Sequence, residues 1–226
     1  MQAIFETGFD LIYLVGILVI GINMIKYSEK GSQFYTFGIM AVVLVLGDSF
    51  HLIPRMVALN TSGLENFTFS LGLGKLITSI TMTIFYVILY WVWKKRYEVS
   101  KTGFLDYLVY LLALVRISLC LLVGNDWFGL SNPLTYRLYR NIPFLLLGIL
   151  IIYLYFIKAW KTKDCNFKYM YLTIILSFAF YIPVVLFEVT YPLVGVLMIP
   201  KTCAYIWTIL IGYIAMKREA NHEKIH

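Results

Sequence analysis

The chain has 226 residues, of which 61% are hydrophobic and only 14% are charged. A composition this apolar excludes a soluble domain of this length. The formal net charge of +7 comes from basic residues spread over several separate segments, which excludes the single basic patch of a nucleic-acid-binding protein.

Long apolar runs dominate the chain, and runs of about 20 apolar residues can cross a bilayer as helices. We expect seven such spans, which run over 8–25, 34–53, 69–93, 104–124, 142–160, 169–189 and 192–215. They predict an all-α integral membrane protein, a seven-transmembrane helix bundle in which residues 1–226 form a single domain. The first run follows acidic rather than basic residues and lacks a small-x-small cleavage site, so we expect an uncleaved span rather than a signal peptide.

Basic residues follow the odd-numbered runs and are scarce in the other connections. These residues are Lys26, Lys30, Lys94, Lys95, Arg96, Lys101, Lys158, Lys161, Lys163, Lys168, Lys217, Arg218 and Lys224. The positive-inside rule therefore places the N-terminus outside and the C-terminus in the cytoplasm. We expect a multi-pass protein of the cell membrane.

The second run ends in LVLGDSFHLIPRM (44–56), where Asp48, His51 and Arg55 break an apolar stretch that we expect Pro54 to stop. Spacings of three and seven residues place the three ionisable side chains on one helical face. A charged side chain in the bilayer core costs roughly 2.5–3.5 kcal/mol on insertion scales. We therefore expect this face to point into the bundle.

Other ionisable residues fall in the same outer half of the membrane. Lys75 opens the third run, Arg116 lies near the middle of the fourth, Arg140 precedes the fifth, Glu188 closes the sixth, and Lys201 lies within the seventh. Because bases outnumber acids in this set, we expect an outward-facing polar cavity for an anionic ligand, such as a phosphate headgroup or a carboxylate. The ligand-binding candidates are Arg55, Lys75, Arg116, Arg140, Lys201 and Tyr205.

A structural interpretation of the same residues stays open. Asp48 with Arg116, or Glu188 with Lys201, would form ion pairs that only fix helix register, while the bases at the span ends extend to lipid headgroups. The three cysteines have no metal-ligand spacing, and His51 is the one histidine inside a run. We expect no metal and no cofactor.

Two stretches suggest an internal repeat. GILVIGINMIK (16–26) is identical to GILIIYLYFIK (148–158) at six of eleven positions. Lys75 and Lys201 occupy similar places near the outer ends of the third and seventh runs. This pattern indicates a 3+1+3 parallel repeat of the kind found in some transporters. The alternative is that apolar helices resemble one another by composition.

The string LGDSFHLIPR (46–55) resembles the L-G-D-x-x-x-L-x-P-R segment of the lysoplasmalogenase-like (YhhN) membrane family. The resemblance implies an all-helical bundle of related halves that hydrolyses the vinyl ether bond of lysoplasmalogens, with Asp48 as proton donor and Glu188 or His51 as its partner. The later Ser-Asp pair of the family is missing, because Ser177 has no adjacent Asp. The activity must therefore be argued from the site.

Three functions are open at this point. The first is a lysophospholipid (vinyl ether) hydrolase-like enzyme, whose partner is a membrane lipid or another anionic amphipathic small molecule. The second is a small-solute transporter in which Lys75 and Lys201 are equivalent ligand contacts. The third is a seven-helix receptor or sensor, although an opsin would need an acid near Lys201, and Leu197 stands one turn before it. Nothing in the sequence indicates an oligomeric state.

Overall fold

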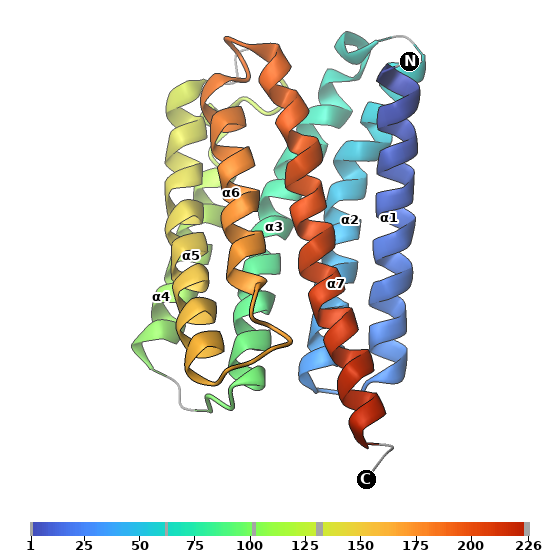
Figure 1. Cartoon of the computed structure of the whole chain (residues 1–226). Helices are drawn as coiled ribbons and strands as arrows, with labels where there is room; N and C mark the ends of the chain where they lie inside the picture. Colours follow the sequence, from blue (N-terminus) through green and yellow to red (C-terminus); the bar gives the residue numbers. More distant parts are fainter. Residues whose placement is uncertain (1, 62, 101–102, 130–132, 224–226) are drawn as a thin grey trace.

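The computed structural model of the chain describes residues 2–61, 63–100, 103–129 and 133–223. These residues form α1 (Gln2–Tyr27), α2 (Gln33–Asn60), α3 (Thr68–Arg96), α4 (Phe104–Cys120), α5 (Leu134–Lys161), α6 (Met170–Phe187) and α7 (Met198–Glu223). Three short 3-10 helices join them: η1 (Leu64–Phe67), η2 (Val123–Asn125) and η3 (Pro192–Leu197). Successive helices run in opposite directions in one bundle, and the two termini lie at opposite ends (Figure 1).

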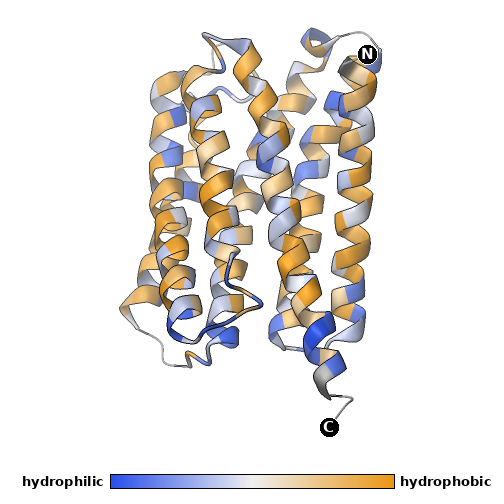
Figure 2. Cartoon of the chain, in the orientation of Figure 1, coloured by the Kyte–Doolittle hydropathy of each residue, from blue (hydrophilic) through white to orange (hydrophobic). Residues whose placement is uncertain are grey.

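Six helical stretches in the described residues are long and apolar enough to cross a membrane. They are Ala3–Tyr27, Gln33–Asn60, Leu64–Arg96, Leu134–Lys161, Met170–Phe187 and Pro192–Asn221. Hydrophobic residues follow most of the length of these helices, and hydrophilic residues gather where the C-terminus lies (Figure 2). The protein is therefore a multi-pass helical membrane protein. Of the seven expected spans, α4, with 17 residues, is not among the six.

Three expected helix boundaries among the first five helices are wrong: the end of α2, the start of α5 and the end of α4. Pro54 does not stop α2, which continues to Asn60. A proline is tolerated inside a membrane helix because neighbouring groups satisfy the backbone that it frees. Helix α5 begins at Leu134, so Arg140 lies inside this helix rather than before it. Arg116 lies in the last turn and a half of α4 and not near its middle, because that helix ends at Cys120.

The seventh run is divided into two helices. The 3-10 helix η3 comes first, and α7 begins at Met198. Pro200 therefore lies in the first turn of α7, where the missing N–H removes no helical hydrogen bond. Pro183 lies inside α6. Lys201 follows Pro200 at the start of α7.

The helices pack mainly against their neighbours in sequence, and α7 closes the bundle by contacting α1 and α2. An aromatic cluster fills the middle of the bundle between α3, α5 and α6. Tyr86 and Phe144 meet edge to face with ring centroids 5.1 Å apart, and Phe178 lies 5.0 Å from Phe144. This geometry is typical of favourable aromatic packing. The cluster forms part of the hydrophobic core between the two ends of the bundle.

Two glycines bring α2 and α3 into close contact. Thr78 Oγ1 of α3 donates a hydrogen bond to the Gly47 carbonyl of α2 at 3.0 Å. A Cβ atom at Gly74 of α3 would overlap the backbone of Phe50 and His51. Small residues at such crossings let membrane helices approach closely. This contact holds the segment of α2 that carries Asp48 and His51.

Candidate functional site

A cavity of about 970 Å³ lies inside the bundle. Its lining residues, which include Phe5 and Glu6, place it toward the end at which α1 begins, marked N in Figure 1. It is lined by every site residue that the sequence singles out: Asp48, His51, Arg55, Lys75, Arg116, Arg140, Glu188, Lys201 and Tyr205. These residues come from α2, α3, α4, α5 and α7 and from the C-terminal end of α6. The structure therefore brings the predicted site residues together around one space.

Acidic side chains line the cavity from α1 and α2. Tyr13 donates a hydrogen bond from its hydroxyl to Asp48 Oδ2 at 2.6 Å. Asp10 is 6% exposed, and its Oδ2 has no hydrogen-bond partner among the described residues. Glu6 forms an ion pair with Arg55 of α2. Spacings of four and three residues place Glu6, Asp10 and Tyr13 on one face of α1.

The two expected partners of Asp48 line the cavity but do not hydrogen-bond to it. His51 has a buried Nδ1 that lacks a hydrogen-bond partner within the described residues. Glu188 instead forms an ion pair with Lys75, with 3.7 Å between Oε1 and Nζ. The alternative pairs Asp48 with Arg116 and Glu188 with Lys201 do not form either.

Basic side chains line the cavity from α4, α5 and α7, and they are buried. The exposed fractions are 2% for Arg116, 5% for Arg137, 8% for Arg140 and 8% for Lys201. In the described part of the chain, no carboxylate oxygen lies within 4.0 Å of the nitrogens of these four side chains. Four buried cations therefore line one cavity without an ion-pair partner.

Neutral groups hold the Arg116 guanidinium. Its carbon lies 3.5 Å from the centroid of the Phe144 ring, a close cation–π contact. Its Nη1 makes long hydrogen bonds to the Arg140 carbonyl at 3.5 Å and to Asn141 Oδ1 at 3.4 Å. Its Nε is buried without a partner in the described residues. A desolvated cation–π contact is worth about 2 kcal/mol, so the ring offsets only part of the burial cost.

The two arginines of α5 are placed in a similar way. Arg140 donates from Nη1 to Asn125 Oδ1 at 2.8 Å, and its guanidinium lies 4.2 Å from the Trp127 ring centroid. Arg137 has a buried Nε and a buried Nη1, and neither atom has a hydrogen-bond partner among the described residues. Both guanidinium groups therefore remain uncompensated by an acid.

Lys201 lies close to two aromatic rings. Its Nζ lies 4.6 Å from the Tyr181 ring centroid and 5.4 Å from that of Tyr205. The Tyr181 hydroxyl donates to Asn141 Oδ1 at 2.9 Å, which connects α6 to α5 beside the arginines. The aromatic rings and the amide orient the cations without neutralising them.

Sequence reasoning missed five residues of this site: Asp10, Tyr13, Arg137, Asn141 and Tyr181. Arg137 and Asn141 were placed outside the fifth run, whereas α5 includes them. Their spacing with Arg140 and Phe144 was the available signal, since residues three, four and seven positions apart share a helical face.

Exposed apolar side chains line the edge of the cavity. Phe5 of α1 is 66% exposed, and Leu193 and Val196 of η3 are 85% and 52% exposed. The cavity therefore reaches the surface of the bundle past apolar groups, whereas its interior is charged.

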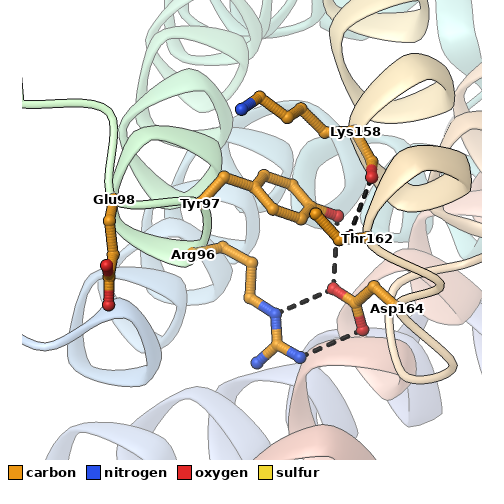
Figure 3. A pocket seen from close by; sticks show the side chains of 6 residues that line it. All are labelled: Arg96, Tyr97, Glu98, Lys158, Thr162 and Asp164. Atoms are coloured by element: carbon orange, nitrogen blue, oxygen red, sulfur yellow. Dashed lines mark hydrogen bonds and ion pairs between the residues drawn. The ribbon is translucent and has the colours of Figure 1, made fainter.

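A second hollow, of about 360 Å³, lies at the opposite end of the bundle (Figure 3). Arg96 donates to both carboxylate oxygens of Asp164, at 2.9 and 3.0 Å, and to Glu219 at 2.5 Å. The Tyr97 hydroxyl also donates to Asp164, at 3.2 Å. Because these charges compensate one another, this end is a structural ion-pair cluster rather than a second candidate site.

Comparisons of the chain with protein families, with curated proteins and with solved structures give no match. The resemblance of residues 46–55 to the lysoplasmalogenase-like family stays a prediction. Among the described residues, no group of three or more His, Cys, Asp or Glu side chains could hold a metal ion. Function has to be argued from the cavity and its charges.

Proposed function

We propose that this protein binds an anionic amphipathic molecule in its charged cavity and hydrolyses it as a lysophospholipid vinyl ether hydrolase. The observation that carries the proposal is the set of four buried cations that line the cavity without a carboxylate partner. Burying an uncompensated charge is costly. An anionic ligand would supply the missing negative charge, which explains why the cations are retained.

The distribution of the other basic residues supports a cavity on the outer side of the cell membrane. Lysines and arginines gather near the ends of α1, α3, α5 and α7, away from the cavity, as with Lys95, Lys158 and Arg218. The positive-inside rule assigns that end to the cytoplasm. The N-terminus and the cavity mouth would then face outward, within reach of lipids of the outer leaflet.

The polarity of the cavity matches a single-chain lipid. The charged interior suits a headgroup, and the exposed apolar residues at the edge, including Phe5 and Leu193, suit an acyl or alkenyl chain. A ligand in this orientation keeps its chain in contact with lipid while its headgroup displaces water from the cations.

Asp48 is the proposed proton donor. Vinyl ether hydrolysis starts with proton transfer to a carbon of the double bond, after which water adds and the hemiacetal breaks into an aldehyde and an alcohol. Tyr13 hydrogen-bonds to Asp48 Oδ2, and none of the described residues hydrogen-bonds to Oδ1. This oxygen is free for the substrate. His51, with its unpartnered Nδ1, would accept the proton of the attacking water.

The test is the Asp48→Asn variant, assayed for release of aldehyde from a vinyl ether lysophospholipid. We expect turnover to fall by roughly 10²–10⁴-fold, the usual contribution of a general acid, with an unchanged melting temperature. Glu29→Gln, at an exposed position near the other end of the bundle, is the control and should retain turnover. Unchanged turnover in Asp48→Asn would remove the hydrolase proposal.

A transporter is the second candidate, because Lys75 and Lys201 line the same cavity. They are equivalent positions in the proposed 3+1+3 repeat, in which α1–α3 and α5–α7 each pack as consecutive neighbours. If Asp48→Asn left lysolipid turnover unchanged, solute flux into proteoliposomes that is lost in Lys201→Ala would support this candidate instead.

A further inference from the structure

We propose that the headgroup bound in the cavity is a phosphate monoester with two negative charges, held by Arg116, Arg137 and Arg140. This inference rests on the proposed function, because it names the headgroup of the anionic amphipath that the cavity is proposed to bind. It separates a monoester such as a lysophosphatidate from a lysolipid whose phosphate carries choline or ethanolamine.

The charges along the cavity wall give the first argument. Glu6 is paired with Arg55 and Glu188 with Lys75, so these two acids are already compensated. The remaining acids of the wall are Asp10 and Asp48, and they stand against the four unpaired cations. With Asp10 ionised and Asp48 protonated, as the proposed proton donor must be, the wall carries three surplus positive charges. A phosphate monoester dianion balances two of these charges, whereas a carboxylate or a phosphodiester balances one.

The arrangement of the donors gives the second argument. The guanidinium carbons of Arg116 and Arg140 lie over aromatic rings, at 3.5 Å and 4.2 Å from the ring centroids, and the N–H groups of a guanidinium point outward in its plane. Arg116 Nε and the Nε and Nη1 atoms of Arg137 are buried without partners in the described residues. Buried donors are almost always hydrogen-bonded. These free edges match the fork geometry with which arginine binds phosphate oxygens.

The groups that position the arginines give the third argument. Asn125 accepts from Arg140, and Asn141 accepts from both Arg116 and Tyr181. Amide oxygens fix the orientation of a guanidinium and leave its positive charge uncancelled. A structural arginine would be expected to meet a carboxylate, as Arg96 meets Asp164 at the other end of the bundle. The site is therefore organised before the anion arrives.

The experiment measures dissociation constants by calorimetry on the full chain, purified in a neutral detergent at pH 8. The ligands are oleoyl lysophosphatidate, oleoyl lysophosphatidylcholine with the same chain, and glycerol 3-phosphate, which has the monoester without a chain. We expect lysophosphatidate to bind at least tenfold more tightly than either of the others. The preference over lysophosphatidylcholine should shrink at pH 5, because the second pKa of a phosphate monoester is about 6.

The matched variants are Arg137→Gln in the cavity and Arg218→Gln at an exposed position at the other end. Arg137→Gln should weaken lysophosphatidate binding by roughly tenfold or more, the usual effect of losing a charged hydrogen bond, and should leave lysophosphatidylcholine binding nearly unchanged. Arg218→Gln should change neither. If Arg137→Gln does not fold, Arg137→Lys is the second variant. It keeps the positive charge but not the forked donors of a guanidinium, and it should lose part of the preference for lysophosphatidate over lysophosphatidylcholine.

The outcomes distinguish the monoester headgroup from the proposed function itself. Equal binding of the two lysolipids at pH 8, or unchanged affinity in the folded Arg137 variant, would overturn the monoester headgroup and leave the proposed function standing. Failure of both lysolipids to bind would overturn the proposed function as well. Binding of glycerol 3-phosphate as tight as that of lysophosphatidate would support the phosphate site and assign its ligand to a soluble source.

Discussion

Arg116 and Arg96 show how differently one residue type is used at the two ends of the bundle. Arg116 is 2% exposed and meets an aromatic ring, an amide and a carbonyl, but no acid of the described residues. Arg96 forms ion pairs with Asp164 and Glu219. The first arrangement leaves the ligand-free protein with an uncompensated buried charge, and the second does not.

Arg116→Met is therefore expected to stabilise the ligand-free protein. Replacing a buried ion pair by apolar side chains of similar volume is often neutral or stabilising by about 1–4 kcal/mol, and Arg116 has no ion-pair partner among the described residues that its removal would leave uncompensated. Melting of the purified variant in detergent checks this, and ligand binding should be lost at the same time. Arg96→Met is the matched control and should destabilise the protein, because it strands two carboxylates. A lower melting temperature for Arg116→Met would assign Arg116 a structural role.

One physical rule, that lipid does not tolerate isolated charges, was enough to select eight of the nine predicted residues that line the cavity, all except Tyr205. The same rule did not give their partners. Asp48 meets Tyr13 rather than Arg116, and Glu188 meets Lys75 rather than Lys201. A partner depends on how each helix is rotated and on which helix lies beside it. Neither quantity is encoded in the spacing of charges along one span.

At the scale of the helices, the crossing of α2 and α3 sets the position of the acidic wall. Helix α3 approaches the backbone of Phe50 and His51 so closely at Gly74 that no side chain fits there. The segment that carries Asp48 is therefore held by backbone contact rather than by flexible side chains. Such a contact transmits any change in helix separation directly to the site.

Gly74→Ala is expected to separate the two helices and destabilise the protein by roughly 1–3 kcal/mol, the usual cost of overpacking. Turnover should fall as Asp48 moves. Gly16→Ala is the control, since a Cβ at Gly16 of α1 meets no atom within 4 Å. The control should be neutral or slightly stabilising, because alanine favours a helix by up to about 1 kcal/mol over glycine. Melting curves and turnover of both variants measure these effects. Equal melting temperatures for Gly74→Ala and Gly16→Ala would contradict the close crossing of α2 and α3.

Hydropathy located the apolar middle of each span, and the six long apolar helices were predictable for this reason. It failed at helix ends that are polar but buried by neighbouring helices. The start of α5 contains Arg137 and Asn141, which read as a connection in the sequence and lie on the cavity wall in the structure. Arg137 was therefore missed as a site residue, because a polar helix end has the same composition as a loop in the sequence.

At the scale of the whole molecule, the two ends of the bundle differ in how their charged residues are paired. The end that holds the C-terminus is joined across α3, α7 and the connection between α5 and α6 by Arg96, Asp164 and Glu219. Figure 3 shows the contact of Arg96 with Asp164. Gln33 of α2 also donates to Glu219, at 3.3 Å. The other end encloses the cavity. The ion pairs therefore hold the helices together at the end with the C-terminus, while the other end contains the cavity.

The joined end predicts a dependence of stability on pH. Burial alone would raise the pKa of Asp164, but hydrogen bonds and charge attraction from Arg96, with backbone N–H groups of Phe167 and Asn166, lower its pKa instead. A carboxyl group with a lowered folded-state pKa contributes stability above its unfolded pKa and loses it as the pH falls through the folded-state value. Asp164→Asn should therefore be less stable than the unmodified protein at neutral pH, by about 1.5–3 kcal/mol.

This difference should begin to shrink below a pH of about 4, the ordinary pKa of an aspartate, and should be smallest below the lowered folded-state pKa, where position 164 is uncharged in both proteins. Melting of the two proteins in detergent at pH 7 and at successively lower pH values measures it. A difference that stays constant over this range would show that the charge of Asp164 contributes nothing.

Trp127 gives the molecule a further property. Its indole ring lines the cavity, and the guanidinium carbon of Arg140 lies over it, 4.2 Å from the ring centroid. We expect an anion that binds in the cavity and draws this cation away from the indole to change the tryptophan emission. Such binding would then be followed by fluorescence without any label attached to the chain.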